Sequence, residues 1–239
     1  MSVEAMIKSI RENCVKNKGG YVPYSQCVQP TKALIESMPA TKGGICRALA
    51  CRWIAEHSKD SSLWNVLFAP GSTNVKQAVI ANTMISFIEG VTTSGSMQNK
   101  SVQNPQNLSG GNYQDLVMDK YLGMYGLIRR NICGDIITGY QTRTAGLNVA
   151  QSIINRMTPT YLNTKSGCYI HLYIGGKGAH SCAAWVGEDV AFFDPNFGEF
   201  YFDKHANFEK FFLYMWDRSG YIKSFNSFQL DAYAKKMRR

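Results

Sequence analysis

The sequence lacks the paired cysteines, long apolar runs and signal segments that mark several large classes of protein. Its seven cysteines include no C-x-x-C pair, so we expect neither a disulfide framework nor a zinc site, and a reducing environment is the better expectation. No stretch approaches the roughly 18 uninterrupted apolar residues that a transmembrane helix needs. The first residues also lack a charged segment followed by an apolar run, so a Sec signal peptide is not expected.

Negative charge is also scarce relative to positive charge. There are 26 lysines and arginines against 17 aspartates and glutamates, a formal net charge of +9. Such an excess favours acidic partners, including anionic membranes and nucleic acid. No segment interleaves aromatic with basic residues as nucleic-acid-binding motifs do, so nucleic acid is not expected as a partner, whereas an anionic membrane surface is. The basic residues at 235–239 are better interpreted as a solvated end of the chain.

The length of 239 residues indicates one domain with a short extension. We expect an N-terminal extension over residues 1–40 and the main domain over 41–239. Residues 92–112 are rich in Ser, Asn, Gln and Gly, and so long a polar loop is usually functional or mobile. We interpret this segment as a surface insertion, either a lid facing the substrate or a disordered connector. No internal repeat is visible.

Helical patterns fill the first two thirds of the chain, and strand patterns follow. Apolar spacing predicts helices over residues 3–16, 31–37, 46–57, 75–88, 113–129 and 147–157. After residue 159, short β-branched and aromatic runs separated by glycine turns predict an antiparallel meander over 168–174, 180–186, 190–194 and 199–202. A terminal helix is predicted over 205–218. The order of elements indicates an α+β fold.

Cys46 is placed where a nucleophilic cysteine would be. The loop before it contains two glycines, and Ile45, Leu49 and Trp53 recur at the four-residue spacing of a helix that starts at Cys46. A thiol in the first turn faces unpaired N–H groups and the positive end of the helix dipole, and both favour the reactive thiolate. Since free cysteines are often small core residues, a structural role stays open on this stretch alone.

A thiolate also needs a base, and four histidines are available. His57 lies eleven positions along the Cys46 helix, or about 16 Å away, which is out of reach. His205 is interpreted as a cap or surface residue, and His171, in mid-strand, as a structural one. His180 begins a strand directly after a glycine loop, where catalytic residues are often exposed. His180 is therefore the predicted base.

Asp194 is the residue predicted to orient His180. If residues 187–189 form a three-residue turn, Val186 faces Val190, Cys182 lies opposite Asp194, and Asp194 lies diagonally from His180 on the same face. A register change of one residue would put Asp194 on the other face. The alternative for Asp194 is an Asp-Pro turn residue that caps its own backbone.

Three blocks together resemble the YopT/AvrPphB-type cysteine proteases, papain-like bacterial effectors delivered into host cells. They are GGICRAL at 43–49 with Trp53-Ile54, GAH at 178–180, and FDPNFGEF at 193–200. The blocks follow the family's order of Cys, His and Asp, and the last one is the most specific. The similarity extends over about residues 43–200, whereas residues 1–40 and 92–112 carry none of it.

The resemblance implies a papain-like cysteine protease fold and a thiol endopeptidase without metal or cofactor. Cys46 would be the nucleophile, His180 the general base and acid, and Asp194 the residue that orients the imidazole. The Cys46 backbone N–H would hold the oxyanion, helped in papain-like enzymes by a side-chain amide slightly upstream. Thr41, five positions before Cys46, is not an amide, and the more distant Gln26 and Gln29 are the candidates that remain.

The resemblance further implies a host protein as substrate. One branch of the family cleaves prenylated Rho-family GTPases beside the lipidated cysteine, another cleaves host kinases, and some members process themselves. The net charge of +9 suits a polybasic GTPase tail poorly, although it favours the anionic membranes where lipidated proteins reside. We expect a monomer, exported by a bacterial secretion system without a Sec signal, that acts in the host cytoplasm or at the inner membrane surface.

Two other classes of function stay open. The same three residues can serve an acyltransferase, or a glutamine deamidase or transglutaminase, because a triad does not dictate water as the acceptor. In the remaining alternative, the chain is a non-catalytic basic binding module in which Cys46 is structural. An ordinary thiol pKa near 8.5 would favour this last alternative.

Overall fold

The computed structural model describes residues 2–37, 45–68, 112–136, 143–164 and 166–235. The predicted helix at 75–88, the glycine loop before Cys46 and nearly all of the polar segment at 92–112 lie outside these residues. Within the described ranges, no helix combines the length and the apolar character needed to cross a bilayer.

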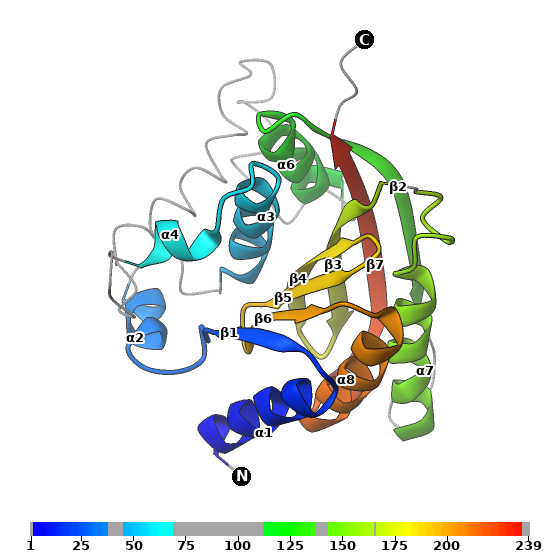
Figure 1. The fold of residues 1–239 in the computed structure, drawn as a ribbon. Coiled ribbons are helices and arrows are strands. Elements are labelled where there is room, and N and C mark those ends of the chain that lie inside the picture. Colours follow the sequence, from blue (N-terminus) through cyan, green and yellow to red (C-terminus); the bar gives the residue numbers. More distant parts are fainter. Residues whose placement is uncertain (1, 38–44, 69–111, 137–142, 165, 236–239) are drawn as a thin grey trace.

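The centre of the fold is a seven-stranded antiparallel sheet (Figure 1). In spatial order its strands are β1 (Gly20–Pro23), β6 (Gly198–Phe202), β5 (Val190–Asp194), β4 (Ala179–Val186), β3 (Cys168–Gly176), β7 (Phe225–Lys235) and β2 (Leu127–Ile136). Strands β3 to β6 form the predicted meander of hairpins. The strands β1, β2 and β7 were not predicted, and they extend the meander at both edges.

Helices cover both faces of the sheet. On one face lie α1 (Val3–Lys16), α7 (Arg143–Arg156), α8 (His205–Arg218) and the short α9 (Tyr221–Ser224). On the other lie α3 (Cys46–His57), α4 (Leu63–Leu67) and α6 (Asn112–Gly123), while α2 (Thr31–Glu36) follows β1. Successive strand residues face opposite layers, so Leu172 packs in the first core and Tyr169 in the second. Two covered faces explain why the central strands consist of nearly continuous apolar residues.

Several predicted elements match the structure, and others are corrected. The helices at 3–16, 46–57 and 205–218 begin and end as predicted. The helix predicted over 113–129 is wrong beyond Gly123, because Gly126 adopts a positive φ of 76° in a turn and β2 begins at Leu127. The helix predicted from 147 begins at Arg143. Helix α8 is not terminal, since Gly220 with a φ of 81° turns the chain into α9 and β7.

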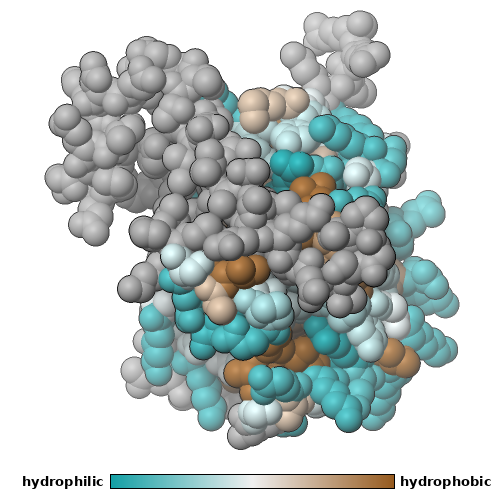
Figure 2. All heavy atoms as spheres, turned by 90° about the vertical axis from the view of Figure 1, so that its left-hand side faces the viewer, coloured by the Kyte–Doolittle hydropathy of each residue, from teal (hydrophilic) through white to brown (hydrophobic). Residues whose placement is uncertain are grey.

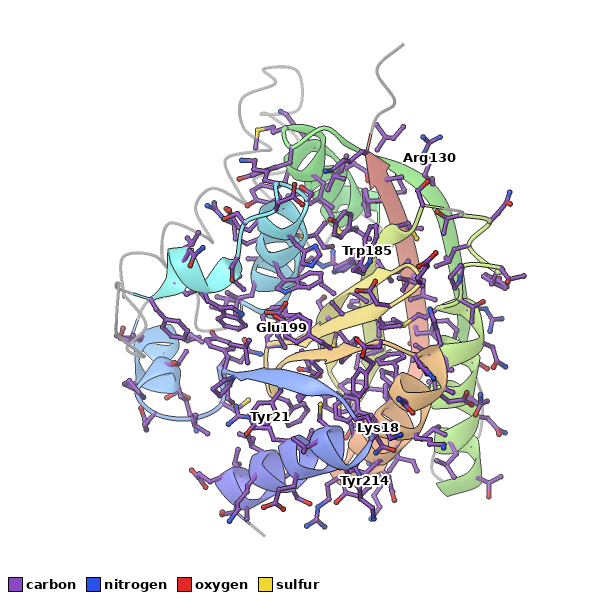
Figure 3. The ribbon with its side chains drawn as sticks, in the orientation of Figure 1. Lys18, Tyr21, Arg130, Trp185, Glu199 and Tyr214 are labelled. Carbon is purple, nitrogen blue, oxygen red and sulfur yellow. The ribbon has the colours of Figure 1, made fainter. Side chains whose placement is uncertain are left out.

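Helix α1 packs on α8 and the sheet, and it also contacts the loop that follows β5. The Ser9 hydroxyl lies 2.7 Å from the hydroxyl of Tyr214, which Figure 3 shows beside α1 and α8. Arg11 donates from Nη2 to the carbonyl oxygen of Tyr24 at 2.9 Å and to that of Phe197 at 3.2 Å. Val15, near the end of this helix, is 58% exposed. The division at residue 40 stays a prediction.

The coloured surface in Figure 2 is mostly hydrophilic, with hydrophobic side chains gathered in small areas between charged and polar ones. The buried aromatic residues lie inside, above all on α8, where Phe208, Phe211, Phe212 and Trp216 pack on the sheet. Burying each such ring contributes on the order of 2 kcal/mol. This aromatic layer fixes β4 and β5, the strands that carry His180 and Asp194.

Candidate active site

Cys46 is the first residue of α3, as predicted. Ile45 precedes it with non-helical angles and no side-chain cap, so the first N–H groups of the helix are not taken by a capping side chain. Burial raises the pKa of the Cys46 thiol. The hydrogen bond and charge of His180, and backbone hydrogen bonds from Ser181 and Arg47, lower it further than burial raises it. The net result is a pKa below the ordinary value, which favours the thiolate.

His180 stands at the start of β4 with 5% of its surface exposed. Its Nε2 lies 2.8 Å from Oδ1 of Asp194, which leaves Nδ1 as the ring nitrogen available to the Cys46 thiol. Burial lowers the pKa of the imidazole, but the charge of Asp194 and the hydrogen bond to it raise the pKa well above its usual value. A lowered thiol pKa beside a raised imidazole pKa favours a thiolate–imidazolium pair.

Asp194 ends β5, and the register that brings it to His180 is the predicted one. Val186 pairs with Val190 and Ala183 with Phe193, so the next position along sets Cys182 opposite Asp194. The Asp194 carboxylate is fully buried. Its Oδ1 also accepts from the backbone N–H of Asn196 at 2.8 Å. Asp194 can therefore both orient His180 and cap the turn, because the same oxygen contacts the imidazole and accepts from the turn backbone.

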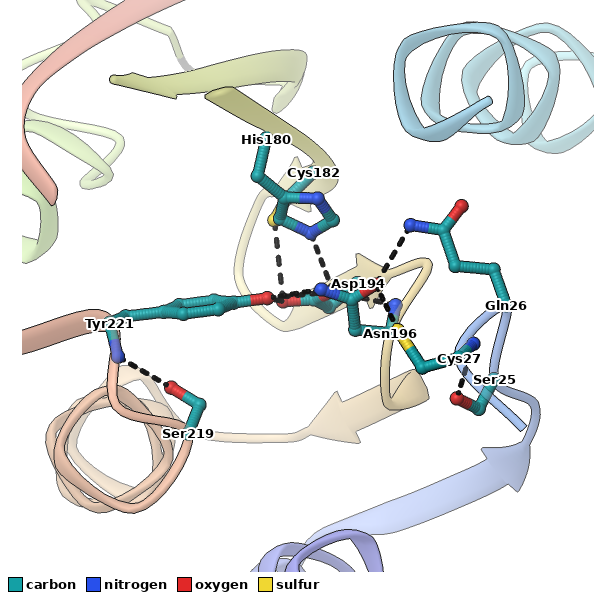
Figure 4. A network of polar contacts seen from close by, with 9 residues as sticks. All are labelled: Ser25, Gln26, Cys27, His180, Cys182, Asp194, Asn196, Ser219 and Tyr221. Carbon is teal, nitrogen blue, oxygen red and sulfur yellow. Dashed lines mark hydrogen bonds and ion pairs between the residues drawn. The ribbon is translucent and has the colours of Figure 1, made fainter. Parts of the chain in front are cut away.

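Tyr221, Asn196 and Gln26 complete a network around this carboxylate, and of these three residues the sequence analysis named only Gln26 (Figure 4). The Tyr221 hydroxyl, at the start of α9, donates to Oδ2 of Asp194 at 3.1 Å, and the Cys182 thiol donates to the same oxygen at 3.5 Å. Asn196 donates from Nδ2 to the Tyr221 hydroxyl at 2.8 Å and accepts at Oδ1 from Gln26 Nε2 at 2.7 Å. Burial, then the charge of Asp194, raises the pKa of Tyr221, so the phenol stays a donor.

The two glutamines named as oxyanion candidates occupy different places. Gln26 lies at the site, bonded to Asn196, and its Oε1 is buried with no hydrogen-bond partner. Gln29 accepts from the backbone N–H of Ala33 at 3.3 Å and so belongs to the start of α2. Thr41 lies outside the described residues. Gln26 is thus the candidate that the structure brings to the site.

The three other histidines contact residues outside the candidate site, and only His171 was predicted to be structural. His57 ends α3, stacks on Trp53 with ring centroids 4.8 Å apart, and has Nδ1 3.1 Å from the Tyr169 hydroxyl. His205 donates from Nε2 to the carbonyl oxygen of Gly187 at 2.8 Å. His171 is fully buried, with Nδ1 3.4 Å from Oδ2 of Asp231.

The sequence of this chain is similar to a known family of proteins. A family model described as Yersinia/Haemophilus virulence surface antigen matches residues 28–234. The cysteine protease yopT1 of Yersinia enterocolitica is 28% identical over 241 residues, covering 95% of this chain and 69% of that protein. The cysteine protease YopT of Yersinia pseudotuberculosis is 29% identical, covering 90% and 63%. This chain therefore spans about two thirds of the length of these relatives.

Among solved structures, the avirulence protein AvrPphB of Pseudomonas has the same fold. The superposition covers 82% of this chain and 95% of AvrPphB, with a TM-score of 0.55 and 13% sequence identity. At that identity the likeness concerns the fold alone. It confirms the α+β architecture that the order of elements predicts and the papain-like fold that the resemblance implies.

Proposed function

The chain belongs to the Peptidase_C58 family of cysteine proteases, and from this premise we propose that it cleaves a host protein with Cys46, His180 and Asp194 as its catalytic residues. One observation carries the assignment. His180 lowers the pKa of the Cys46 thiol at the start of α3, and the Nε2 of the same imidazole lies 2.8 Å from a buried carboxylate.

In the proposed reaction, the Cys46 thiolate attacks the carbonyl carbon of the scissile peptide bond. The His180 imidazolium then gives its Nδ1 proton to the leaving amine, and a thioester remains on Cys46. A water molecule next gives its proton to Nδ1 and attacks the thioester, which releases the acid and restores the thiol pair. Asp194 holds the ring orientation and stabilises the imidazolium in both steps.

The oxyanion that forms in both steps needs hydrogen-bond donors. The backbone N–H of Cys46 is one, because the first N–H groups of α3 have no side-chain cap. We assign the second donor to Gln26, the side-chain amide that lies beside Asn196. Losing one such donor costs on the order of a hundredfold in kcat. Gln26→Ala should therefore lose about that much, whereas Gln29→Ala, at the start of α2, should keep its rate.

We place the substrate in a host cell because the matching family is described as a virulence surface antigen. A lipidated Rho-family GTPase and a host kinase are the two substrate classes to separate. The net charge of +9 favours encounter at an anionic membrane surface, where a lipidated substrate would be found. In this proposal the enzyme acts as a monomer, is exported without a Sec signal, and works in the host cytoplasm or at the inner membrane surface.

The decisive experiment is intact-mass analysis of host-cell proteins after incubation with the wild type or with Cys46→Ala, membrane and soluble fractions kept apart. Fragments formed only by the wild type would support proteolysis, and their termini would identify the substrate and bond. Release of Rho-family proteins from the membrane fraction without their prenylcysteine would assign the GTPase branch. A mass gain of about one dalton without cleavage would instead assign a deamidase, and no change at all would contradict the proposal.

A further inference from the structure

Cys182 places a second thiol on the side of His180 that faces Asp194. His180 and Cys182 are two positions apart on β4 and so point to the same face, and Asp194 lies across from them on β5. One ligand atom from each residue lies within 4.8 Å of the others, and all three residues are buried. Figure 4 shows the three side chains converging. The described part of the chain holds no other such group of His, Cys, Asp and Glu.

The distances within this group suit a tetrahedral metal ion. Zinc binds imidazole nitrogen and carboxylate oxygen at about 2.0–2.2 Å and thiolate sulfur at about 2.3 Å, so its ligand atoms stand roughly 3.3–3.6 Å apart. Here Cys182 Sγ lies 3.5 Å from Asp194 Oδ2, and His180 Nε2 lies 2.8 Å from Asp194 Oδ1. These two distances go to different oxygens of the carboxylate, and the three ligand atoms all lie within 4.8 Å of one another, so a metal ion would draw the side chains closer together. A mixed set of nitrogen, sulfur and oxygen donors is typical of zinc.

We propose that His180, Cys182 and Asp194 bind a zinc ion that inhibits the protease. The ion would replace the proton between Nε2 and Asp194 and the thiol proton of Cys182, and both protons would pass to solvent. Three protein ligands leave one position for water, so we expect a reversible inhibitor and not a structural ion. The inhibition, though not the binding, rests on the proposed function.

The mechanism of inhibition follows from the two nitrogens of the imidazole. With Nε2 on zinc, the neutral ring carries its remaining proton on Nδ1. This N–H is a weaker acid than the imidazolium N–H that would protonate the leaving amine, and Nδ1 has no lone pair left to accept a proton from water. The bound zinc ion also replaces the hydrogen bond between His180 and Asp194 that orients the ring. The site escapes a search for C-x-x-C pairs because it combines H-x-C on one strand with an aspartate on the next.

An ion held instead by the thiolate of Cys46 and the imidazole would be the ordinary way for zinc to poison a cysteine protease. The two sites differ in their ligands, since only the proposed one uses Cys182 and keeps its ligands when Cys46 is removed. Cys168, another buried strand cysteine at 3% exposure, pairs with Val186 at the other end of the β3–β4 hairpin and offers a matched control.

The binding experiment uses the Cys46→Ala protein, titrated with Co²⁺ and followed by visible absorption, with Zn²⁺ added as competitor. We expect one equivalent to bind with tetrahedral bands and a thiolate-to-cobalt charge-transfer band. Adding Cys182→Ala should abolish the charge-transfer band and weaken binding at least about tenfold, while adding Cys168→Ala should change neither. If Cys182→Ala fails to fold by circular dichroism, Asp194→Asn in the Cys46→Ala background should weaken binding to the same degree. Loss of binding in Cys46→Ala alone, or a charge-transfer band that survives Cys182→Ala, would overturn the proposal.

The activity experiment compares zinc inhibition of the wild type, Cys182→Ala and Cys168→Ala, each relative to its own zinc-free rate. The inhibition constant should rise at least about tenfold in Cys182→Ala, stay unchanged in Cys168→Ala, and inhibition should reverse with a chelator. An unchanged constant in Cys182→Ala would contradict the inhibitory role. Zinc binding by Cys46→Ala together with no cleavage by the wild type would refute the protease proposal and leave the metal site standing.

Discussion

In the described part of the chain, Cys46 and Cys51 each lie near a histidine–aspartate pair, and we propose only the Cys46 group as the active site. Cys46, His180 and Asp194 meet where α3 begins and β5 ends. Cys51 lies five residues further along α3 near Asp231, which pairs across β3 and β7 with His171. Both histidines contact a fully buried carboxylate, at 2.8 Å in the first group and 3.4 Å in the second. The residue types are thus the same, and the surroundings decide their roles.

The surroundings differ in helix position and in charge. Cys51 is in mid-helix and fully buried, and burial raises its pKa far above the ordinary value, whereas the pKa of Cys46 is lowered. Asp231 also accepts from Arg129 at 3.1 Å and from Gln229 at 2.9 Å, so its charge is already balanced. Burial raises the pKa of Asp231, but the hydrogen bond from His171 and the other contacts lower it further. The interior group therefore has the surroundings of a structural group, whereas the lowered thiol pKa at the helix start supports the proposed nucleophile.

The largest expected difference between the two groups is in the effect of removing each thiol. Cys46→Ala should lower the cleavage rate at least about a thousandfold, because no other nucleophile replaces the thiolate. Cys51→Ala should keep the rate within about twofold and lower the free energy of unfolding by about 1 kcal/mol, since it leaves a small cavity. Peptide-cleavage kinetics and urea unfolding measure the two effects. A Cys51→Ala enzyme that cleaves slowly but has normal stability would contradict the structural role of Cys51.

The aspartates offer the next largest difference. Asp194→Asn should lower kcat by about 10²–10⁴, because the amide no longer stabilises the imidazolium or fixes the tautomer of His180. Asp231→Ala should lower the free energy of unfolding by about 3 kcal/mol, since it leaves His171 and Arg129 without their buried carboxylate, with a much smaller change in kcat. Stability curves and kcat for both variants test this, and equal losses of activity would contradict it.

Two buried tyrosines, one in each region, allow a smaller difference to be tested. The Tyr221 hydroxyl donates to Asp194 at 3.1 Å, and the Tyr233 hydroxyl donates to Asp119 at 2.7 Å. Tyr221→Phe should lower kcat/KM about tenfold, the effect of one hydrogen bond to a carboxylate that positions the base. Tyr233→Phe is the matched control, and its kcat/KM should stay within about twofold. If both variants lose activity alike, Tyr221 has no special positioning role.

The smallest expected effect is on the pH profile. The thiolate–imidazolium pair exists above the lowered pKa of Cys46 and below the raised pKa of His180. Hence kcat/KM should be bell-shaped, with its acid limb below the ordinary thiol value of 9.0 and its alkaline limb above the ordinary histidine value of 6.5. Asp194→Asn removes the charge that raises the His180 pKa, so the alkaline limb should move to lower pH. A limb that stays in place would show that another group sets it.

The raised pKa of His180 should also make the free energy of unfolding depend on pH. A folded-state pKa of His180 above the unfolded value adds stability that is complete below the unfolded pKa and is lost as pH rises through the folded pKa. His180→Ala should therefore destabilise the protein more at low pH than at high pH. Urea unfolding across the pH range measures this, and a constant difference would contradict it.

The sequence predicted the contact between His180 and Asp194 because a single short turn fixes it. Once residues 187–189 close the hairpin, every later pair is set, and Asp194 falls beside His180. Tyr221 and Gln26 could not be found in this way, since they reach the site from 27 and 170 positions away in contacts that tertiary packing alone creates. No local spacing encodes such contacts.

The missed strands have a similar cause. In β7, Gln229 and Asp231 point to the sheet face that carries the interior polar group, so the strand is not as apolar as its central position would suggest. In β2, Leu127 and Ile128 continue the apolar spacing of the preceding helix, which hid the turn at Gly126. In both cases a tertiary requirement overrode the local pattern.

The place of β7 has a consequence for how the protein matures. This strand comes later in the chain than every other strand that the structure describes, yet it lies between β3 and β2. Tyr221, four residues before it, holds Asp194. During synthesis, neither the sheet nor the carboxylate contact can be completed until β7 leaves the ribosome. A growing or prematurely terminated chain that stops before β7 therefore lacks the assembled centre, so the cell that makes the enzyme is exposed to it only after β7 has been translated.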